Sequence, residues 1–308
     1  MATGYFSHPD CRRHEMGRGH PECPERLAAI DDLLLATGLD VALDKREAPT
    51  ADLRDVERAH SAAYVANLAD LMRQVAESGR PRAIDPDTIV SPHTLGATLR
   101  AAGAAVAATD AVIDRELENA FCSVRPPGHH ATHSGAMGFC FINNVAVAAR
   151  HALDVRGLNR VAIVDFDVHH GNGTEDIFSG DDRVLMVGFF QHPFYPYSGT
   201  EHPADNMVNL PVPAYTKGME IRDLVEMMWM PRLEAFKPEM IFISAGFDAH
   251  REDDLGQLGL VEADYEWLTR RIMEVAERHA KGRIVSCLEG GYNLSALARS
   301  VAAHLKTL

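Results

Sequence analysis

One stretch of the chain, VAIVDFDVHHGNG at residues 161–173, contains side chains that could bind a metal ion. A short apolar run leads into Asp165, Asp167 and His169, which alternate along the chain. If the extended conformation continues through them, their side chains share one face, because successive strand side chains point to opposite sides. Buried carboxylates are costly unless they are paired or bind a metal. The pattern therefore predicts either a hydrogen-bonded pair that closes a strand or a metal site.

A metal site on Asp167 and His169 needs a third protein ligand, because a catalytic zinc site typically has three protein ligands and one open position. Asp248, in the motif SAGFDAH, is the candidate, since it also follows an apolar run. His250 in the same motif is its rival, and we expect it to be a surface or helix-start histidine. Two carboxylates and one imidazole suit Zn²⁺, with Fe²⁺ and Mn²⁺ as alternatives.

Two adjacent histidines, His129 and His130, follow a Pro-Pro-Gly bend in RPPGHHATHSG. They could be metal ligands or catalytic bases. An imidazole that acts as a base is usually held through its other nitrogen by a carboxylate or an amide. Asp165, which the metal set leaves over, and Asn172 are suitable orienting groups.

A tyrosine, Tyr292, follows two glycines in the motif LEGGYN. One interpretation is a turn residue with its hydroxyl in solvent. The other is a hydrogen-bond donor to an oxyanion that develops during a reaction.

All of these motifs follow short apolar runs, namely AFCSV, VAIVDF, MIFISA and IVSCL, which are typical of buried parallel strands. Helical patterns lie between them. Residues 94–113 are rich in Ala and Leu, and residues 261–282 place apolar side chains at steps of three and four before Gly282, a candidate helix stop. This alternation predicts a parallel α/β sheet with helices on both faces. Since ligands of such sheets bind beyond the carboxyl ends of the strands, we expect one site built from four loops.

Composition limits the classes of function. The chain has 308 residues, 46% of them hydrophobic, and a formal net charge of −14. That charge argues against non-specific nucleic-acid binding and slightly favours cationic substrates. Five cysteines without a CxxC pair indicate a reducing compartment, and there is neither a signal peptide nor an apolar run of membrane-spanning length. We therefore predict a cytoplasmic protein that binds no membrane.

Five motifs together resemble one known family. RPPGHHA, GFCFINNVAVAA, DFDVHHGNGTEDIF, SAGFDAH and LEGGYNL, in this order, are similar to motifs of the histone deacetylase family of metal-dependent amidohydrolases, which includes bacterial acetylpolyamine deacetylases. HPECPERL resembles the opening loop of that family. The resemblance implies a single catalytic domain over residues 1–308, with an arginase-like fold: a central, mostly parallel, eight-stranded sheet flanked by helices.

The resemblance also implies a role for each motif residue. Asp167, His169 and Asp248 match the ligands of one zinc ion per chain. His130 matches the general base and His129 its electrostatic partner. The remaining catalytic matches are Asp165, which should support His129, Asn172, which should support His130, and Tyr292, the transition-state tyrosine. Asn at the second supporting position resembles the class II branch of the family.

Further matches concern the path of the substrate. Phe139 and Tyr195 match walls of a substrate tunnel and Leu255 its mouth, while Gly128 and Gly138 should line its floor. Outside the tunnel, Arg26 resembles a buried arginine near an acetate exit. Asp87 or Asp85 should accept a hydrogen bond from the substrate backbone at the rim. Many relatives bind K⁺ through carbonyls around residues 165–169, with the help of a serine hydroxyl at a position where this chain has Gly188.

These matches predict a zinc-dependent amidohydrolase that removes acetyl or other acyl groups from lysine side chains of peptides or proteins. An acetylpolyamine deacetylase is the alternative, and the oligomeric state stays open. A two-metal, arginase-type hydrolase would need further carboxylates, yet Gly171 follows DVHH and GFDAH supplies only one. A catalytically silent binding protein would lack the metal ligands or Tyr292.

Overall fold

The computed structural model describes residues 2–308, and its centre is one sheet of eight strands. The strand order is β2-β1-β5-β10-β9-β6-β7-β8, and every neighbouring pair is parallel. The strands are β1 (Thr3–Ser7), β2 (Asp44–Glu47), β5 (Asn119–Cys122), β6 (Val161–Asp165), β7 (Val184–Gln191), β8 (Met207–Val212), β9 (Met240–Ala245) and β10 (Ile284–Leu288). The predicted eight-stranded α/β fold is therefore confirmed.

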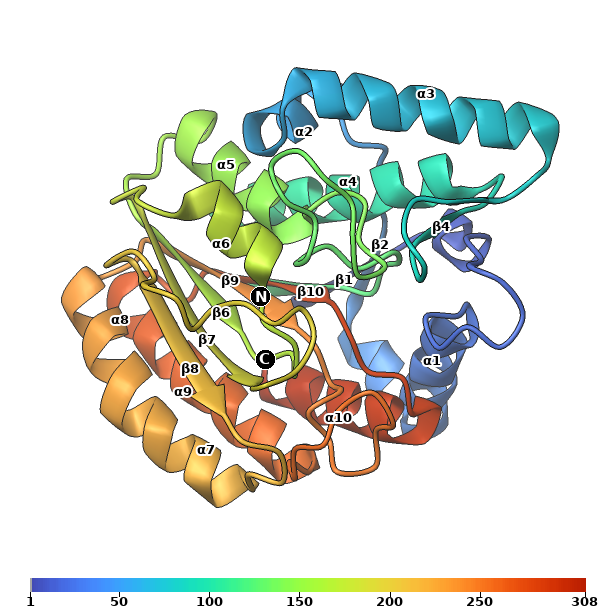
Figure 1. The fold of residues 1–308 in the computed structure, drawn as a ribbon. Helices are drawn as coiled ribbons and strands as arrows, with labels where there is room; N and C mark the ends of the chain where they lie inside the picture. Colours follow the sequence, from blue (N-terminus) through green and yellow to red (C-terminus); the bar gives the residue numbers. More distant parts are fainter. Residues whose placement is uncertain (1) are drawn as a thin grey trace.

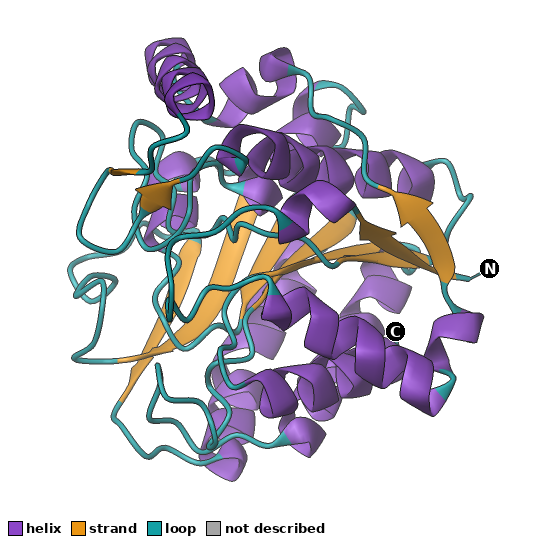
Figure 2. Ribbon diagram, turned by 90° about the vertical axis from the view of Figure 1, so that its right-hand side faces the viewer, coloured by secondary structure: helices purple, strands orange, loops and turns teal. Residues whose placement is uncertain are grey.

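Two helical layers enclose this sheet (Figures 1 and 2). The layer above it in Figure 1 contains α2 (Leu53–Ala59), α3 (Ala62–Ser78), α4 (Thr94–Ile113), α5 (Asn144–Asp154) and α6 (Asn172–Phe178). The layer below contains α1 (Glu25–Thr37), α7 (Gly218–Leu224), a π-helical turn (Val225–Trp229), α8 (Met230–Phe236), α9 (Glu262–His279) and α10 (Leu294–Thr307). Because both faces are covered, every residue of β5, β6, β7, β9 and β10 is buried.

The two predicted helices are present. Residues 94–113 form α4, whose many alanines let it pack closely on the sheet. Residues 262–279 form α9, which buries Tyr265, Leu268, Ile272 and Val275 along one side. Gly282 has a left-handed φ of 78° and donates its N–H to the carbonyl of Ala276 in the last turn of α9. It therefore caps the C-terminal end of the helix.

The order of the strands brings the four polar motifs together. β5, β10, β9 and β6 are consecutive in the middle of the sheet, although they are far apart in the sequence. Since the strands are parallel, their carboxyl ends lie at one edge. A small antiparallel pair, β3 (Arg82–Ala83) and β4 (Ile89–Val90), adds the loop that carries Asp85 and Asp87. Over residues 2–308, no helix has the length and apolar character needed to cross a membrane.

Candidate active site

Three predicted ligands meet where β6 and β9 end. The Nδ1 atom of His169 lies 3.0 Å from Oδ1 of Asp167 and 3.1 Å from Oδ2 of Asp248. The second oxygen of each carboxylate is held by a backbone amide: Gly290 N donates to Asp167, and Val168 N donates to Asp248. Phe166 and Val168 are buried as well, but β6 ends at Asp165 and the chain bends at residues 167–169, so the regular strand on which the expected alternation depended does not extend through the ligands.

This triad fits a divalent cation. Two carboxylates and an imidazole converge within 4.8 Å, and all three residues are buried. Within residues 2–308, neither carboxylate has a lysine or arginine partner, so a cation is the missing counter-charge. Burial lowers the pKa of His169, but hydrogen bonds to Asp167 and Asp248 outweigh it and raise this pKa to about 10. A metal ion would replace that proton, because a ligating imidazole must be deprotonated.

Two glycines lie directly against the carboxylates of the triad. A Cβ atom on Gly246 would collide with the carboxylate of Asp167, and one on Gly290 would collide with that of Asp248. Both glycines therefore allow the backbone to approach the ligands closely.

The histidine pair lies beside the triad. The rings of His129 and His130 are 4.0 Å apart, and the ring of His130 is 5.9 Å from that of His169. Each histidine contacts the predicted orienting group: His129 Nδ1 lies 3.0 Å from Asp165 Oδ2, and His130 Nδ1 lies 2.7 Å from Asn172 Oδ1.

The two imidazoles differ in charge. Burial lowers the pKa of His129, but the charges of Asp167 and Asp165 outweigh it, so this pKa lies well above 6.5. Burial, helped by the charges of His129 and His169, holds the pKa of His130 well below 6.5. A charged imidazole therefore lies next to a neutral one, the arrangement expected of a stabilising group and a base.

Tyr292 is held by its backbone and by its ring. Its N–H and that of Asn293 both donate to Oδ2 of Asp253, at 2.6 and 2.9 Å. The guanidinium of Arg26 lies 5.0 Å from the centre of the tyrosine ring. Burial raises the pKa of Tyr292 well above 10, so its hydroxyl remains a donor.

A cavity of about 700 Å³ leads to these groups. His130, His169 and Tyr292 line it, and all five residues predicted to contact the substrate do so as well: Gly138, Phe139, Tyr195, Leu255 and Asp87. The side chain of Asp85 also reaches the mouth, but its oxygens accept hydrogen bonds from Asp87 N and from Thr88 within its own loop. Of the two rim candidates, Asp87 therefore has the carboxylate that is free of partners among residues 2–308.

Two predictions are wrong. Gly128 does not line the tunnel: a Cβ atom there would collide with the backbone N of Asn144, so this glycine allows the histidine loop to pack on the start of α5. His250 is not a surface residue but wholly buried, because the chain after β9 folds back and His250 forms a β-bridge with Leu260.

Other singled-out residues have contacts of their own. His170 points away from the triad, with Nδ1 at 2.8 Å from Ser198 Oγ and Nε2 at 2.8 Å from Glu175 Oε2. Arg26 is buried and bonds the backbone carbonyls of Glu289 and Gly291. Gly188 pairs in register with Asp165 and offers no hydroxyl, so the K⁺ site remains a prediction.

Sequence reasoning missed three residues at this site. Phe194 lines the cavity and stacks on His169, with ring centres 5.4 Å apart. Asp253 anchors the backbone of Tyr292, as described above. Glu289 is a wholly buried carboxylate directly after β10. Only Glu289 had a signal, because a charged residue at the end of an apolar run is the pattern that pointed to Asp165.

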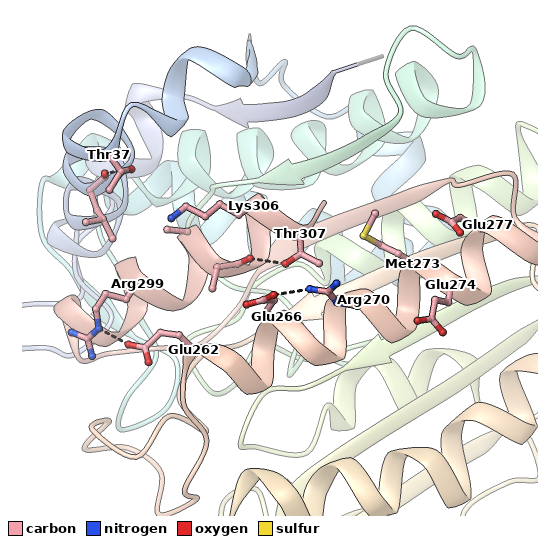
Figure 3. A pocket seen from close by; sticks show the side chains of 13 residues that line it. Thr37, Glu262, Glu266, Arg270, Met273, Glu274, Glu277, Arg299, Lys306 and Thr307 are labelled. Atoms are coloured by element: carbon pink, nitrogen blue, oxygen red, sulfur yellow. Dashed lines mark hydrogen bonds and ion pairs between the residues drawn. The ribbon is translucent and has the colours of Figure 1, made fainter.

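A second hollow, of about 670 Å³, lies between α1, α9 and α10 (Figure 3). Two pairs of its charged side chains form ion pairs, Arg299 with Glu262 and Arg270 with Glu266. None of the predicted catalytic residues lines it. Chemistry, rather than size, therefore selects the cavity at the strand ends.

Fold and site define an α/β protein that gathers a metal-binding triad, a histidine pair and a tyrosine around one cavity. This chain belongs to the histone deacetylase family, since the histone deacetylase domain model matches residues 20–308. It is 38% identical, over 96% of its length and 82% of the relative's, to a probable deacetylase of Archaeoglobus fulgidus. It is 37% identical to a histone deacetylase-like amidohydrolase of Pseudomonas aeruginosa, over 89% of this chain and 73% of that one.

A solved structure agrees with these relatives. The crystal structure of the HDA15 HD domain superposes with a TM-score of 0.92 at 31% identity, covering 99% of this chain and 88% of that one. The protein is thus a hydrolytic deacetylase on the arginase/deacetylase fold.

Proposed function

We propose that this deacetylase is a zinc-dependent amidohydrolase, with one ion per chain, that removes acetyl or longer acyl groups from lysine side-chain amides. One observation carries the proposal: the metal-binding triad, His130 and Tyr292 lie around a single cavity whose walls suit an unbranched stem. A divalent cation bound by Asp167, His169 and Asp248 would supply Lewis acidity, polarising the amide carbonyl and lowering the pKa of water.

His130 is the proposed general base. It is neutral, it lines the cavity, and Asn172 holds its Nδ1, so Nε2 is the nitrogen free to accept a proton from the attacking water. His129 keeps its positive charge against Asp165 and stabilises the negative charge that develops nearby.

Tyr292 is the proposed donor to the tetrahedral oxyanion. Its hydroxyl stays protonated. The backbone hydrogen bond that Tyr292 donates to Asp253 and the contact of its ring with Arg26 fix the orientation of the side chain before the reaction starts. A histidine of the pair then returns a proton to the leaving nitrogen, which gives a free amine and a carboxylate.

The cavity walls fit the aliphatic part of an acyl-lysine. Phe139 and Tyr195 line it together with Phe194, and Gly138 leaves room, since a Cβ atom there would press on the ring of His130. Beyond the walls, the free carboxylate of Asp87 can accept hydrogen bonds from backbone amides of a bound peptide.

The test is a hydrolysis panel of acetyl-lysine peptides, longer acyl-lysine peptides and acetylpolyamines. Enzyme stripped with a chelator should be inactive and should regain activity with about one equivalent of Zn²⁺; parallel samples with Fe²⁺ and Mn²⁺ identify the preferred ion. Asp248→Asn is the matched control, because it keeps the side-chain shape while weakening metal binding. Full activity of the stripped enzyme would contradict metal dependence, and two tightly bound ions would favour the arginase-type alternative.

An acetylpolyamine is the second candidate, and the charge of the mouth favours it. Asp85, Asp87 and Asp254 line the cavity, while no lysine or arginine among the described residues does. A polyamine substrate places ammonium groups near these carboxylates. Asp254→Asn should then raise KM for acetylpolyamines about tenfold and leave KM for an uncharged acetyl-lysine peptide unchanged. Turnover of acetylpolyamines alone would replace lysine peptides as the proposed substrate.

We also propose a cytoplasmic setting. The five cysteines form no disulfide among residues 2–308, as expected in a reducing compartment.

A further inference from the structure

Glu289 is a buried carboxylate to which the chemistry above gives no task. It follows β10 directly and is fully shielded from solvent. Within residues 2–308, no lysine or arginine side chain bonds its carboxylate, since Arg26 reaches only its backbone carbonyl. A buried charge without a cationic partner is costly, so its hydrogen bonds should explain its presence.

Those hydrogen bonds hold the histidine loop. Oε2 of Glu289 accepts from the backbone N–H of Gly128 at 2.6 Å and from that of His129 at 3.1 Å. Oε1 accepts from the hydroxyl of Ser244 in β9 at 3.2 Å. One side chain therefore joins β9, the end of β10 and the loop that follows β5, and these three strands are neighbours in the sheet.

The backbone of His129 is held from both sides. Glu289 binds its N–H, and its carbonyl accepts from Gly173 N at 3.0 Å and Thr174 N at 3.2 Å in α6. Asp165 and Asn172 orient the two imidazole rings, but a ring is placed only as accurately as the Cα atom that carries it. Glu289 supplies the anchor on the amide side.

The same residue also belongs to the Tyr292 turn. The N–H of Glu289 bonds the carbonyl of Ala245, and that of the next residue, Gly290, bonds the metal ligand Asp167. A shift of the carboxylate would thus change the spacing between the histidine pair, the triad and the tyrosine.

We propose that Glu289 is a positioning residue: by accepting the amides of Gly128 and His129, it sets the distance from the histidine pair to the triad and to Tyr292. It touches no substrate and acts through His129 and His130. The inference rests on the proposed function for its effect on turnover, but the contact itself can be tested without a substrate.

Three substitutions separate reach from charge. Glu289→Gln keeps the length and one oxygen for both amides, and its NH₂ can donate to Ser244, so only the charge is lost. Glu289→Asp keeps the charge but is one methylene shorter. Glu289→Ala removes both. Ser244→Ala is the matched control, because it removes the bond to the other oxygen and leaves the two amides bound.

We expect kcat to depend on whether the side chain at position 289 is long enough to accept both amides, and not on its charge. We expect the Ala and Asp variants to lose about 10²-fold in kcat, because misplacement of a base by about 1 Å costs that much, with KM and bound metal unchanged. The Gln and Ser244→Ala variants should stay within about fivefold of the wild type. Amide hydrogen exchange at Gly128 and His129, measured by mass spectrometry, should accelerate in the Ala and Asp variants only.

Three results would overturn the proposal: wild-type kcat in both the Asp and Ala variants, unchanged exchange at the two amides, or a Gln variant as slow as Ala, which would assign the effect to charge. If the Ala variant fails to fold, the Asp and Gln pair decides alone. If the wild type cleaves no acyl amide while exchange still follows the series, the proposed function fails and the anchoring role stands.

Discussion

Of the two neighbouring histidines at this site, His129 is charged and His130 is neutral, because their surroundings differ. His129 faces the carboxylates of Asp165 and Asp167, whereas His130 faces an uncharged amide, Asn172. The hydrogen bond to Asn172 raises the pKa of His130, but burial and the charges of His129 and His169 outweigh it; a carboxylate at position 172 would raise this pKa further. The choice of Asn at this position should be visible in the pH dependence of the reaction.

Asn172→Asp should move the acidic limb of the kcat profile to higher pH. A carboxylate beside His130 favours its protonated form, which raises its pKa and removes the base at a pH where the wild type still has it. We expect a shift of about one pH unit or more, measured with an acyl-lysine peptide at saturating metal. An acidic limb that stays in place would show that His130 is not the titrating base.

Tyr292→Phe should lower kcat about 10²-fold while the content of bound metal stays the same. The phenyl ring preserves the packing against Arg26 and Phe139, so the change removes only the hydroxyl that donates to the oxyanion. Metal analysis and kcat on the same preparation check this. Unaltered turnover would exclude the role given to Tyr292.

At the scale of elements, one loop builds a wall of the tunnel. Phe194 and Tyr195 lie in the segment between β7 and β8, which has no regular secondary structure of its own. His170 connects this segment to α6, because it bonds Ser198 in the loop and Glu175 in the helix. The wall is therefore tied to the same stretch of chain that carries the metal ligands.

Ser198→Ala should raise KM about fivefold and leave kcat within about twofold. It removes one partly buried hydrogen bond, worth about 1 kcal/mol, that holds the loop to His170, while no catalytic group is touched. Steady-state kinetics with one acyl-lysine peptide separate the two constants. A loss confined to kcat would mean that the loop acts on the chemistry and not on binding.

How far the sequence predicts this molecule depends on the kind of signal. Apolar runs followed by polar residues predicted the strands and the edge where the site forms, since burial on both faces leaves a distinct pattern. The contact of Glu289 with the histidine loop left no such pattern in the sequence, because its partners there are the backbone amides of Gly128 and His129 and not distinctive side chains. Gly128 shows a related limit: a glycine marks a close approach, but the approaching group, here the backbone of Asn144, is visible only in the fold.

For the whole molecule, three buried histidines each contribute to a loss of stability in acid. Burial lowers the pKa of His14 and of His60 to about 4 and that of His304 to about 3. Each is neutral in the folded state, whereas the unfolded chain binds a proton as the pH falls through about 6.5. Above about pH 6.5 these histidines do not affect stability. Below that pH the unfolded chain binds protons that the folded chain does not, so the free energy of unfolding declines until the pH reaches the pKa of the folded state.

The free energy of unfolding should fall by about 2 kcal/mol for each such histidine between pH 7 and pH 5. His304→Gln should reduce the decline by that amount, because a glutamine can still bond Thr269 and Ser286 but does not titrate. Denaturant unfolding at the two pH values measures the difference. Equal declines in variant and wild type would refute the assignment to His304.

The place of β10 in the sheet has a consequence for biosynthesis. Among the eight strands of this sheet it is the last in the sequence, yet it lies between β5 and β9. Until residues 284–288 emerge, two apolar strands have open edges that can recruit other nascent chains. Glu289 and Tyr292 follow every other site residue in the sequence, so the site cannot be complete before they emerge. Rapid synthesis of residues 284–288, or binding of a chaperone to the open edges of β5 and β9, would limit aggregation of the partly synthesised chain.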